Sequence, residues 1–173
     1  MQISSLAQIV DANIQGEPSI SFIYDIKTKS SLIREGDAFV SNNFQEIQKA
    51  VSKGAFCIIY SNKNIEIHDP EIAWLLVEDL QNALIKIVRF LFANLKLKAF
   101  FCEKLTFEML KIFKKKDKKI FFLDDNIVKN FEQIKSIENQ SFIFCSNEEY
   151  LYKVYPAAKK FKSAHYRLKN VTE

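Results

Sequence analysis

The sequence predicts an α/β protein built on mostly parallel sheets. Short apolar runs of strand length alternate with amphipathic segments of helix length along most of the 173 residues, which is the pattern of βαβ units. Some of these runs, such as residues 55–60, are apolar throughout, as expected for strands that helices cover on both faces. The hydrophobic fraction of 48% and the 16 phenylalanines provide enough apolar side chains for a sizeable core.

The first part of the chain, residues 1–95, is expected to form one small α/β domain. Apolar side chains recur at helical spacing in three segments, residues 4–12, 44–53 and 79–95. Gly54 follows the second of these segments, at the position where many helices end. Strands are expected in four segments between the helices, residues 20–25, 38–40, 55–60 and 73–77.

The second part, residues 96–173, is expected to form a reduced α/β domain, a Rossmann-like βαβαβα unit with a mostly parallel sheet. Its expected strands are residues 99–102, 120–123 and 141–145. Its expected helices are residues 106–113, 126–137 and 148–161. Pro156 should kink or divide the last helix, because proline lacks the N–H that a helix interior needs.

Glycine and cysteine usage narrows the classes of function. The chain has three glycines and none follows Gly54, so the second part contains no glycine-rich loop that could wrap a phosphate. The cysteines Cys57, Cys102 and Cys145 each lie in an apolar run and are expected to be buried thiols in a reducing compartment. No signal peptide or membrane-length apolar segment is evident, which predicts a cytoplasmic protein without membrane insertion.

The net charge of +4 arises from residues 96–173, which are rich in lysine. A basic half can indicate nucleic-acid binding, and this is one alternative function. No recognisable nucleic-acid motif accompanies the charge, so a lysine-rich solvated surface is the favoured interpretation.

Five short pieces within residues 18–95 follow one another in an order that is typical of a known enzyme family. The pieces are Tyr24-Asp25-Ile26-Lys27, Glu35-Gly36-Asp37-Ala38-Phe39-Val40, Asn42-Asn43-Phe44, Ala50 through Lys53-Gly54-Ala55, and Val77-Glu78-Asp79-Leu80-Gln81-Asn82-Ala83-Leu84. No single piece is specific, but their order and their placement on strands and helices resemble the N-terminal substrate-binding domain of the Mur ligases, which extend UDP-MurNAc-peptides.

The resemblance implies a domain that holds the UDP end of a sugar nucleotide. On this sequence the implied ligand-binding residues are Asp25, Lys27, Asn42 and Asn43. The family's Ser-Arg pair is replaced by Ile26-Lys27, and its Asp-Gly-His loop by Ser41-Asn42-Asn43. These changes remove a hydroxyl, a bidentate guanidinium, a glycine and a histidine. Both a weakened UDP site and a retained fold without UDP binding therefore stay open, and the second is favoured.

The resemblance also implies an ATP-binding P-loop at the start of a central domain, and this sequence departs from it there. Lys104 and Thr106 stand near the place of the family's P-loop lysine and threonine, but without glycines they should not bind ATP. Residues 96–173 are thus a remnant of the central domain or an unrelated unit. We expect no cofactor and no ligase activity, and instead a module that binds a protein partner in cell-wall synthesis or a UDP-MurNAc-type ligand.

A second candidate site follows the strand expected at residues 120–123. Asp124 and Asp125 stand where open α/β sheets place their ligands, and two carboxylates there could hold Mg²⁺ beside a phosphate or act in a small enzyme. The favoured interpretation is a turn and a cap for the helix that begins near Asn126.

Overall fold

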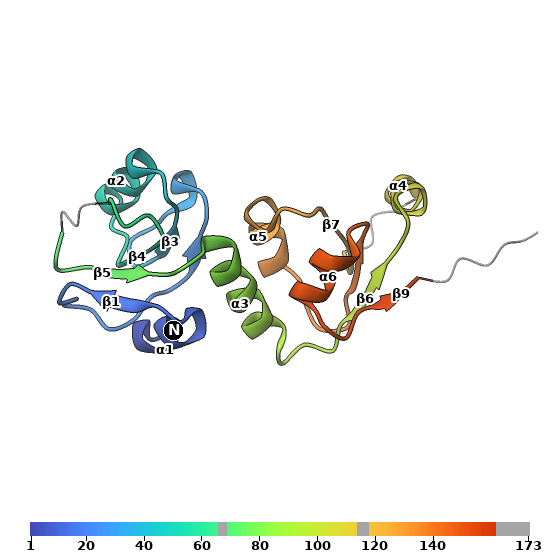
Figure 1. Cartoon of the computed structure of the whole chain (residues 1–173), viewed down its shortest axis with the longest axis horizontal. Coiled ribbons are helices and arrows are strands. Elements are labelled where there is room, and N and C mark those ends of the chain that lie inside the picture. Colours follow the sequence, from blue (N-terminus) through green and yellow to red (C-terminus); the bar gives the residue numbers. More distant parts are fainter. Residues whose placement is uncertain (66–68, 114–117, 162–173) are drawn as a thin grey trace, which may run out of the picture.

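The computed structural model describes residues 1–65, 69–113 and 118–161. It contains two sheets, which lie on either side of one helix, α3 (Leu80–Phe92) (Figure 1). The α/β fold class predicted from the sequence is confirmed. Each part of the sequence contributes a sheet of its own, so the molecule is elongated along the line that joins the two sheets.

The first sheet has five strands in the order β1-β5-β4-β3-β2. The strands are β1 (Asn13–Gln15), β2 (Ile26–Lys27), β3 (Ala38–Val40), β4 (Cys57–Tyr60) and β5 (Ala73–Leu76). Strand β1 is antiparallel to β5, and the other neighbours are parallel. Helix α2 (Phe44–Ser52) and a short 3-10 turn (Ser30–Leu32) cover one face, where Phe39, Ile58 and Trp74 pack. Helix α1 (Ile3–Val10) and α3 cover the other face.

The second sheet has four parallel strands in the order β7-β8-β6-β9. The strands are β6 (Lys98–Phe101), β7 (Ile120–Leu123), β8 (Phe142–Cys145) and β9 (Lys159–Lys160). Helices α3, α5 (Ile127–Lys135) and α6 (Glu148–Val154) cover the inner face. Helix α4 (Lys104–Phe113) lies on the outer face, against phenylalanines of the strands.

Helix α3 joins the two sheets into one hydrophobic core. Asp79 caps its first turn, because the Asp79 carboxylate accepts a 2.7 Å hydrogen bond from the Asn82 N–H. The helix contacts α1 on the side of the first sheet and α5 and α6 on the side of the second. One cluster of buried apolar side chains therefore extends from α1 to β8. The domain boundary at residue 95 stays a prediction, since this core crosses it.

Two predicted elements are wrong in part. Residues 20–25 do not form the predicted strand. Within them only Phe22 makes an isolated β-bridge, to Gln2, and β2 begins at Ile26. The last helix ends at Val154 instead of residue 161, because Pro156 cannot donate the hydrogen bond that another turn would need. Strand β9 follows and pairs with β6 at the edge of the second sheet.

The cysteines are free and buried, as predicted. Burial raises the pKa of Cys102 to about 11, so this thiol is neutral at neutral pH and acts as an apolar packing group. None of the helices in the described ranges is long and apolar enough to cross a membrane.

Candidate functional site

The carboxyl ends of β3 and β4 meet at a polar edge that contains two of the predicted ligand-binding residues. The Asn42 side-chain oxygen accepts hydrogen bonds from the backbone N–H groups of Ser61 and Asn62, at 2.8 and 3.2 Å. The Asn42 amide nitrogen donates to the Ser61 hydroxyl at 2.9 Å. Asn42 therefore fixes the loop after β3 against the loop after β4.

Asn43 begins the next helix. Its side-chain oxygen accepts a 3.1 Å hydrogen bond from the Glu46 N–H, which makes Asn43 the N-cap of α2. The Asn43 backbone N–H donates to the Ser41 hydroxyl at 3.0 Å. Both asparagines thus have structural roles at this edge, where open α/β sheets also place their ligands.

Asp25 and Lys27 lie in an ion cluster that joins β2 to α5. The Lys27 ammonium is 2.6 Å from one Asp25 carboxylate oxygen, and the Lys135 ammonium is 3.0 and 3.1 Å from the two Asp25 oxygens. Lys135 also donates to the Ile26 carbonyl at 2.6 Å and lies 2.9 Å from a Glu132 oxygen. Four charged groups therefore link the first sheet to the second part of the chain.

The cluster changes the pKa values of its members. Partial burial alone would raise the pKa of Asp25, but hydrogen bonds from Lys27, Lys135 and the Ile26 N–H outweigh it and hold the pKa below the usual 3.8. Partial burial alone would lower the pKa of Lys27, and its hydrogen bond to Asp25 raises it above 10.5. The two groups therefore stay ionised as a pair at neutral pH.

The structure thus divides the predicted ligand-binding set into two pairs. Asn42 and Asn43 organise the loops at the ends of β3 and β4, and Asp25 and Lys27 face Lys135 of α5. The long-range contact to Lys135 was beyond the reach of sequence reasoning, because 110 residues separate it from Asp25.

The turn before β3 explains one of the sequence pieces. Gly36 has a φ of +89°, which favours glycine, and its N–H donates to the Gly54 carbonyl at 2.8 Å. The Tyr24 ring lies directly over Gly36, in the space where any other residue would place its Cβ atom. The buried Asp37 carboxylate accepts a 3.0 Å hydrogen bond from the Arg34 N–H and closes the turn. Gly36 and Asp37 are therefore needed for the turn itself.

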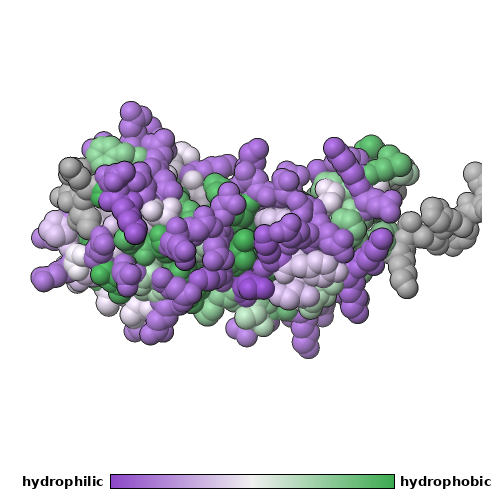
Figure 2. All heavy atoms as spheres, viewed as in Figure 1, coloured by the Kyte–Doolittle hydropathy of each residue, from purple (hydrophilic) through white to green (hydrophobic). Residues whose placement is uncertain are grey.

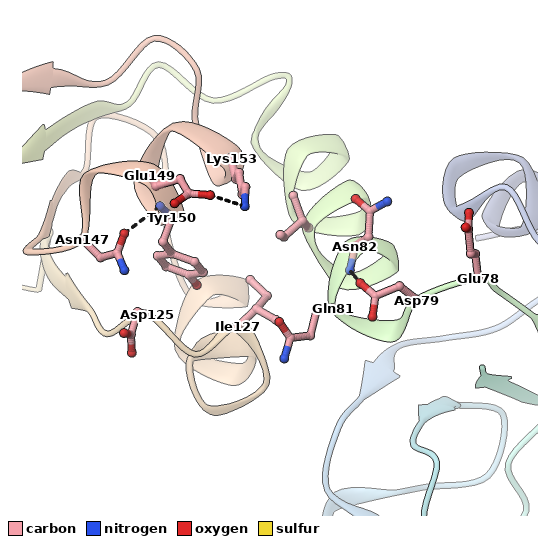
Figure 3. Close-up of a pocket in the computed structure, with 11 residues that line it drawn as sticks. Glu78, Asp79, Gln81, Asn82, Asp125, Ile127, Asn147, Glu149, Tyr150 and Lys153 are labelled. Carbon is pink, nitrogen blue, oxygen red and sulfur yellow. Dashed lines mark hydrogen bonds and ion pairs between the residues drawn. The ribbon is translucent and has the colours of Figure 1, made fainter. Parts of the chain in front are cut away.

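A hollow of about 560 Å³ lies between the two parts of the chain, where α3, α5 and α6 begin (Figure 3). Its wall is mostly polar and contains Glu78, Asp79, Gln81, Asn82, Ile85, Asp125, Ile127, Asn147, Glu149, Tyr150 and Lys153. The Asn147 side chain caps α6 by accepting a 2.9 Å hydrogen bond from the Tyr150 N–H. Burial raises the pKa of Tyr150 to about 12, so its hydroxyl stays protonated at neutral pH.

The sequence analysis did not predict that the residues of this hollow lie close together. Each of its three helices begins directly after a strand, and a capping Asp or Asn stands at each junction: Asp79, Asn126 and Asn147. Because parallel strands end at the same edge of a sheet, such junctions are expected to converge. This repeated pattern was the available signal, although nothing in the sequence indicates that both sheets turn these edges toward each other.

The side chains of Asp124 and Asp125 have different surroundings. Asp125 lies in the wall of the hollow, whereas the exposed Asp124 side chain is 3.6 Å from the Lys111 ammonium. Asn126 caps α5 by accepting a 3.1 Å hydrogen bond from the Lys129 N–H, which agrees with the favoured turn-and-cap interpretation. In residues 1–65, 69–113 and 118–161, no group of three or more His, Cys, Asp or Glu could hold a metal ion.

The connection from β6 to α4 contains only two residues, Cys102 and Glu103. Cys102 is buried, and its N–H donates to the Cys145 carbonyl at 3.0 Å, so it continues the sheet. Lys104 and Thr106 lie in the first turn of α4. A connection of this length offers no loop of free backbone N–H groups around a phosphate.

Comparison with solved structures identifies the fold. A MurF structure from Acinetobacter baumannii matches 83% of this chain with a TM-score of 0.57 and 19% identity. A structure of UDP-N-acetylmuramoylalanyl-D-glutamyl-2,6-diaminopimelate--D-alanyl-D-alanyl ligase from the same organism matches 92%, with a TM-score of 0.60 and 19% identity. The chain has a Mur-ligase-like fold. The MurF ligase of Thermotoga maritima, solved in complex with ADP, matches 75% with a TM-score of 0.55 and 19% identity.

The Mur-ligase-like chain covers only part of these enzymes. It spans 35%, 41% and 34% of the three ligase chains, so well under half of each enzyme has a counterpart here. The sequence matches no protein-family profile and no curated protein. The structural likeness extends beyond residues 18–95, on which the sequence resemblance rests, into the second part of the chain, because a match to 92% of the chain must include it.

Proposed function

We propose that this chain is a non-catalytic Mur-ligase-like protein that acts as a binding or interaction module in peptidoglycan precursor synthesis. The fold supports the link to that process, since one of the solved structures with this fold is a ligase named for a UDP-N-acetylmuramoylalanyl compound. The proposal assigns the chain recognition of a precursor or of a protein partner, without the ATP-driven step of a ligase.

The two-residue connection between β6 and α4 is the observation that carries the non-catalytic part. An ATP-dependent ligase must hold the triphosphate during phosphoryl transfer, and backbone N–H groups of a glycine-rich loop provide most of that contact. Here Cys102 is buried in the sheet and Glu103 would bring a negative charge toward the phosphates. Lys104 at the start of α4 is then the single cation at this place, and one cation without loop N–H groups is not enough to bind a nucleoside triphosphate.

The ligand-binding part of the proposal rests on the polar edge of the first sheet. Asn42 and Asn43 hold the ends of β3 and β4 in fixed positions, and Lys27 lies on the neighbouring strand. Amide and hydroxyl groups at such an edge are suited to uracil and ribose, and an ammonium to the diphosphate. Because Lys27 is already paired with Asp25, a diphosphate would have to compete with this carboxylate for the ammonium. We therefore expect weak binding of a UDP-sugar.

Calorimetric titration with UDP-MurNAc-peptide tests this proposal, with Lys27→Ala and Lys135→Ala as matched variants. Each variant removes one cation from Asp25 and one link between β2 and α5, since Lys27 also lies 3.9 Å from Glu132 of α5, but only Lys27 belongs to the predicted ligand set. The UDP-sugar version predicts binding that is lost in Lys27→Ala and retained in Lys135→Ala. Equal loss in both would assign the effect to the ion cluster instead.

Two further outcomes separate the versions of the proposal. If millimolar UDP-MurNAc-peptide produces no heat, the sensor version is wrong and only the role in binding a protein partner remains. ADP release from ATP in the presence of precursor and amino-acid acceptor, measured on the full chain, would contradict the non-catalytic assignment altogether.

A further inference from the structure

A second hollow, of about 520 Å³, lies where the 3-10 turn (Ser30–Leu32) meets α2. Hydrophilic residues predominate in the part of Figure 2 where Figure 1 places α2. The described residues that line the hollow are three lysines, two serines, a threonine and a glutamate, so its wall has no aromatic or aliphatic side chain. We call this space the basic hollow.

The wall of the basic hollow has an excess of positive charge. Its cations are Lys29, Lys49 and Lys53, and Glu46 is the single acid among the described residues that line it. Hydrogen bonds from Lys49 and Ser30 hold the pKa of Glu46 below the usual 4.5, so Glu46 is ionised at neutral pH. Three cations and one anion leave an excess of two positive charges. A phosphate monoester, which carries about 1.5–2 negative charges at pH 7, would neutralise this excess.

Contacts within the chain hold two of the three lysines in place. The Lys53 ammonium donates to the carbonyls of Ser30 and Ser31, at 2.9 and 3.4 Å. The Lys49 ammonium donates to a Glu46 oxygen at 2.7 Å, and the other Glu46 oxygen accepts from the hydroxyl of the buried Ser30. The turn and the helix therefore position both ammonium groups, which lowers the entropic cost of binding a ligand between them.

Several donors of the basic hollow have no partner in residues 1–65, 69–113 and 118–161. An ammonium has three N–H donors, of which Lys53 uses two and Lys49 uses one. The Lys29 ammonium and the Ser31 hydroxyl make no hydrogen bond or ion pair with these residues. Lys49 and Lys53 are four positions apart, so their side chains extend from the same side of α2. Both the turn and the helix thus provide donors for the oxygens of an anion.

We propose that the basic hollow binds a small hydroxylated molecule that bears a phosphate monoester, of the sugar-phosphate class. The three ammonium groups hold the phosphate through charge-assisted hydrogen bonds. A volume of about 520 Å³ is in the range of small-molecule sites and leaves room for a body beside the phosphate. Because the wall is polar throughout, it suits a body with hydroxyl groups better than an aromatic base, which needs an apolar or aromatic surface to stack on.

The proposal goes beyond the binding role given above. Asp25, Lys27, Asn42 and Asn43 do not line the basic hollow, and its ligand needs no uridine, so either proposal can fail without the other. The hollow is open to water, and the Lys49 side chain is 62% exposed. We therefore expect weak binding, with a Kd on the order of 0.5 mM at low salt.

NMR titration of the full chain with glucose 6-phosphate, inorganic phosphate and glucose tests the proposal. Glucose 6-phosphate should shift the amide signals of Ser30, Ser31, Lys49 and Lys53, and glucose should shift none of them. Inorganic phosphate should bind at the same place several-fold more weakly. If both phosphate compounds leave these signals unchanged, the site is wrong. If both bind equally well, the assignment of a hydroxylated body is wrong.

Lys49→Gln and Lys153→Gln form a matched pair of variants. Each lysine pairs with a glutamate of its own helix, at 2.7 and 2.6 Å, and their side chains are 62% and 59% exposed. Both changes remove one charge, but only Lys49 lines the basic hollow. Lys49→Gln should weaken binding of glucose 6-phosphate about tenfold, and Lys153→Gln should bind as the wild type does.

Two further measurements separate a site from general attraction to a basic protein. Lys49→Arg retains the charge and should retain binding, and thermal unfolding should confirm that all three variants are folded. Raising NaCl from about 20 mM to about 300 mM should weaken wild-type binding about tenfold, because exposed ammonium groups are screened. Equal loss of binding in Lys49→Gln and Lys153→Gln, or binding that does not depend on salt, would overturn the proposal.

Discussion

The two sheets of this protein share one core but differ on the faces that point away from it. The first sheet packs Phe39, Ile58 and Trp74 beneath α2, and these side chains are almost fully buried. The second sheet has a stack of phenylalanines on its outer face, and in the described residues α4 and the Phe161 ring cover this stack. The apolar face of the first sheet is therefore fully covered within the chain. The apolar face of the second sheet is covered by α4, but α4 itself has exposed apolar side chains on its outer face.

The largest expected effect tests whether the core is shared. Phe131 of α5 is fully buried in the cluster that extends across α3, so Phe131→Ala should lower the free energy of unfolding by about 3–5 kcal/mol. Because the cluster contacts both sheets, amide hydrogen exchange should accelerate in β4 and in β8 alike. Urea unfolding and exchange measured by mass spectrometry check this. Acceleration confined to β8 would show that the two sheets have independent cores.

A somewhat smaller effect is expected on the outer face of the second sheet. Phe144 is the central ring of the stack, and Phe144→Ala should lower the free energy of unfolding by about 2–4 kcal/mol. Faster exchange should appear in β6 and β7 and leave β4 unchanged. Phe144→Leu, which retains most of the apolar volume, serves as the control and should lose less than half as much. Faster exchange in the first sheet would contradict the separation of the two outer faces.

The ion cluster should add a pH-dependent contribution that links the two sheets. The pKa of Asp25 is lower in the folded protein, so its ionised form stabilises the fold above pH 4 or so, and this stabilisation is lost as the pH falls through the folded pKa. Asp25→Asn should remove that part of the pH dependence and lower the free energy of unfolding at pH 7 by about 1–2 kcal/mol, a value reduced for partial solvent exposure.

Denaturation curves measured between pH 7 and pH 3 check this expectation. Asp124→Asn is the control, because Asp124 is largely exposed and contacts only Lys111 in the ion pairs of the described residues. Its curve should follow that of the wild type. If Asp25→Asn loses as much stability on acidification as the wild type, the cluster has no role in the pH response.

The smallest expected effects come from the helix caps and are similar in the two sheets. Asn43→Ala and Asn147→Ala each remove the acceptor for one backbone N–H, and each should lower the free energy of unfolding by about 1 kcal/mol. Asn43→Asp and Asn147→Asp retain an acceptor and should stay close to the wild type. A loss of several kcal/mol from Asn43→Ala would indicate that this residue has a further structural role at the edge of the first sheet.

Local sequence signals predicted those elements that local interactions determine. The apolar runs that became β4, β5, β7 and β8 lie between amphipathic segments, and a capping Asp or Asn preceded four of the helices. The three-residue strand β1 was missed, because it is too short to show an alternating pattern and depends on pairing with β5. The end of α6 was placed too late, although Pro156 was recognised as an obstacle to the helix.

The candidate site was predicted less well for a physical reason. Asn42 and Asn43 act on neighbours within twenty residues, so their place at the sheet edge follows from the strand order. Asp25 and Lys27 depend on Lys135, whose position is determined by how the second part packs on α3. No pattern of spacing or composition reports the relative placement of two sheets, and the polar hollow between them depends on the same placement.

The strand order of the second sheet has a consequence for synthesis on the ribosome. In the first sheet β2, β3, β4 and β5 are neighbours in the order in which they are made, so each can pair as soon as it emerges. Strand β6, by contrast, lies between β8 and β9, which are made about 40 and 60 residues later. Contacts of such long range form slowly, because the loop must close before they contribute. The phenylalanines of β6 are therefore expected to stay unpaired until β8 has been made, so this segment remains exposed while about 40 further residues are translated.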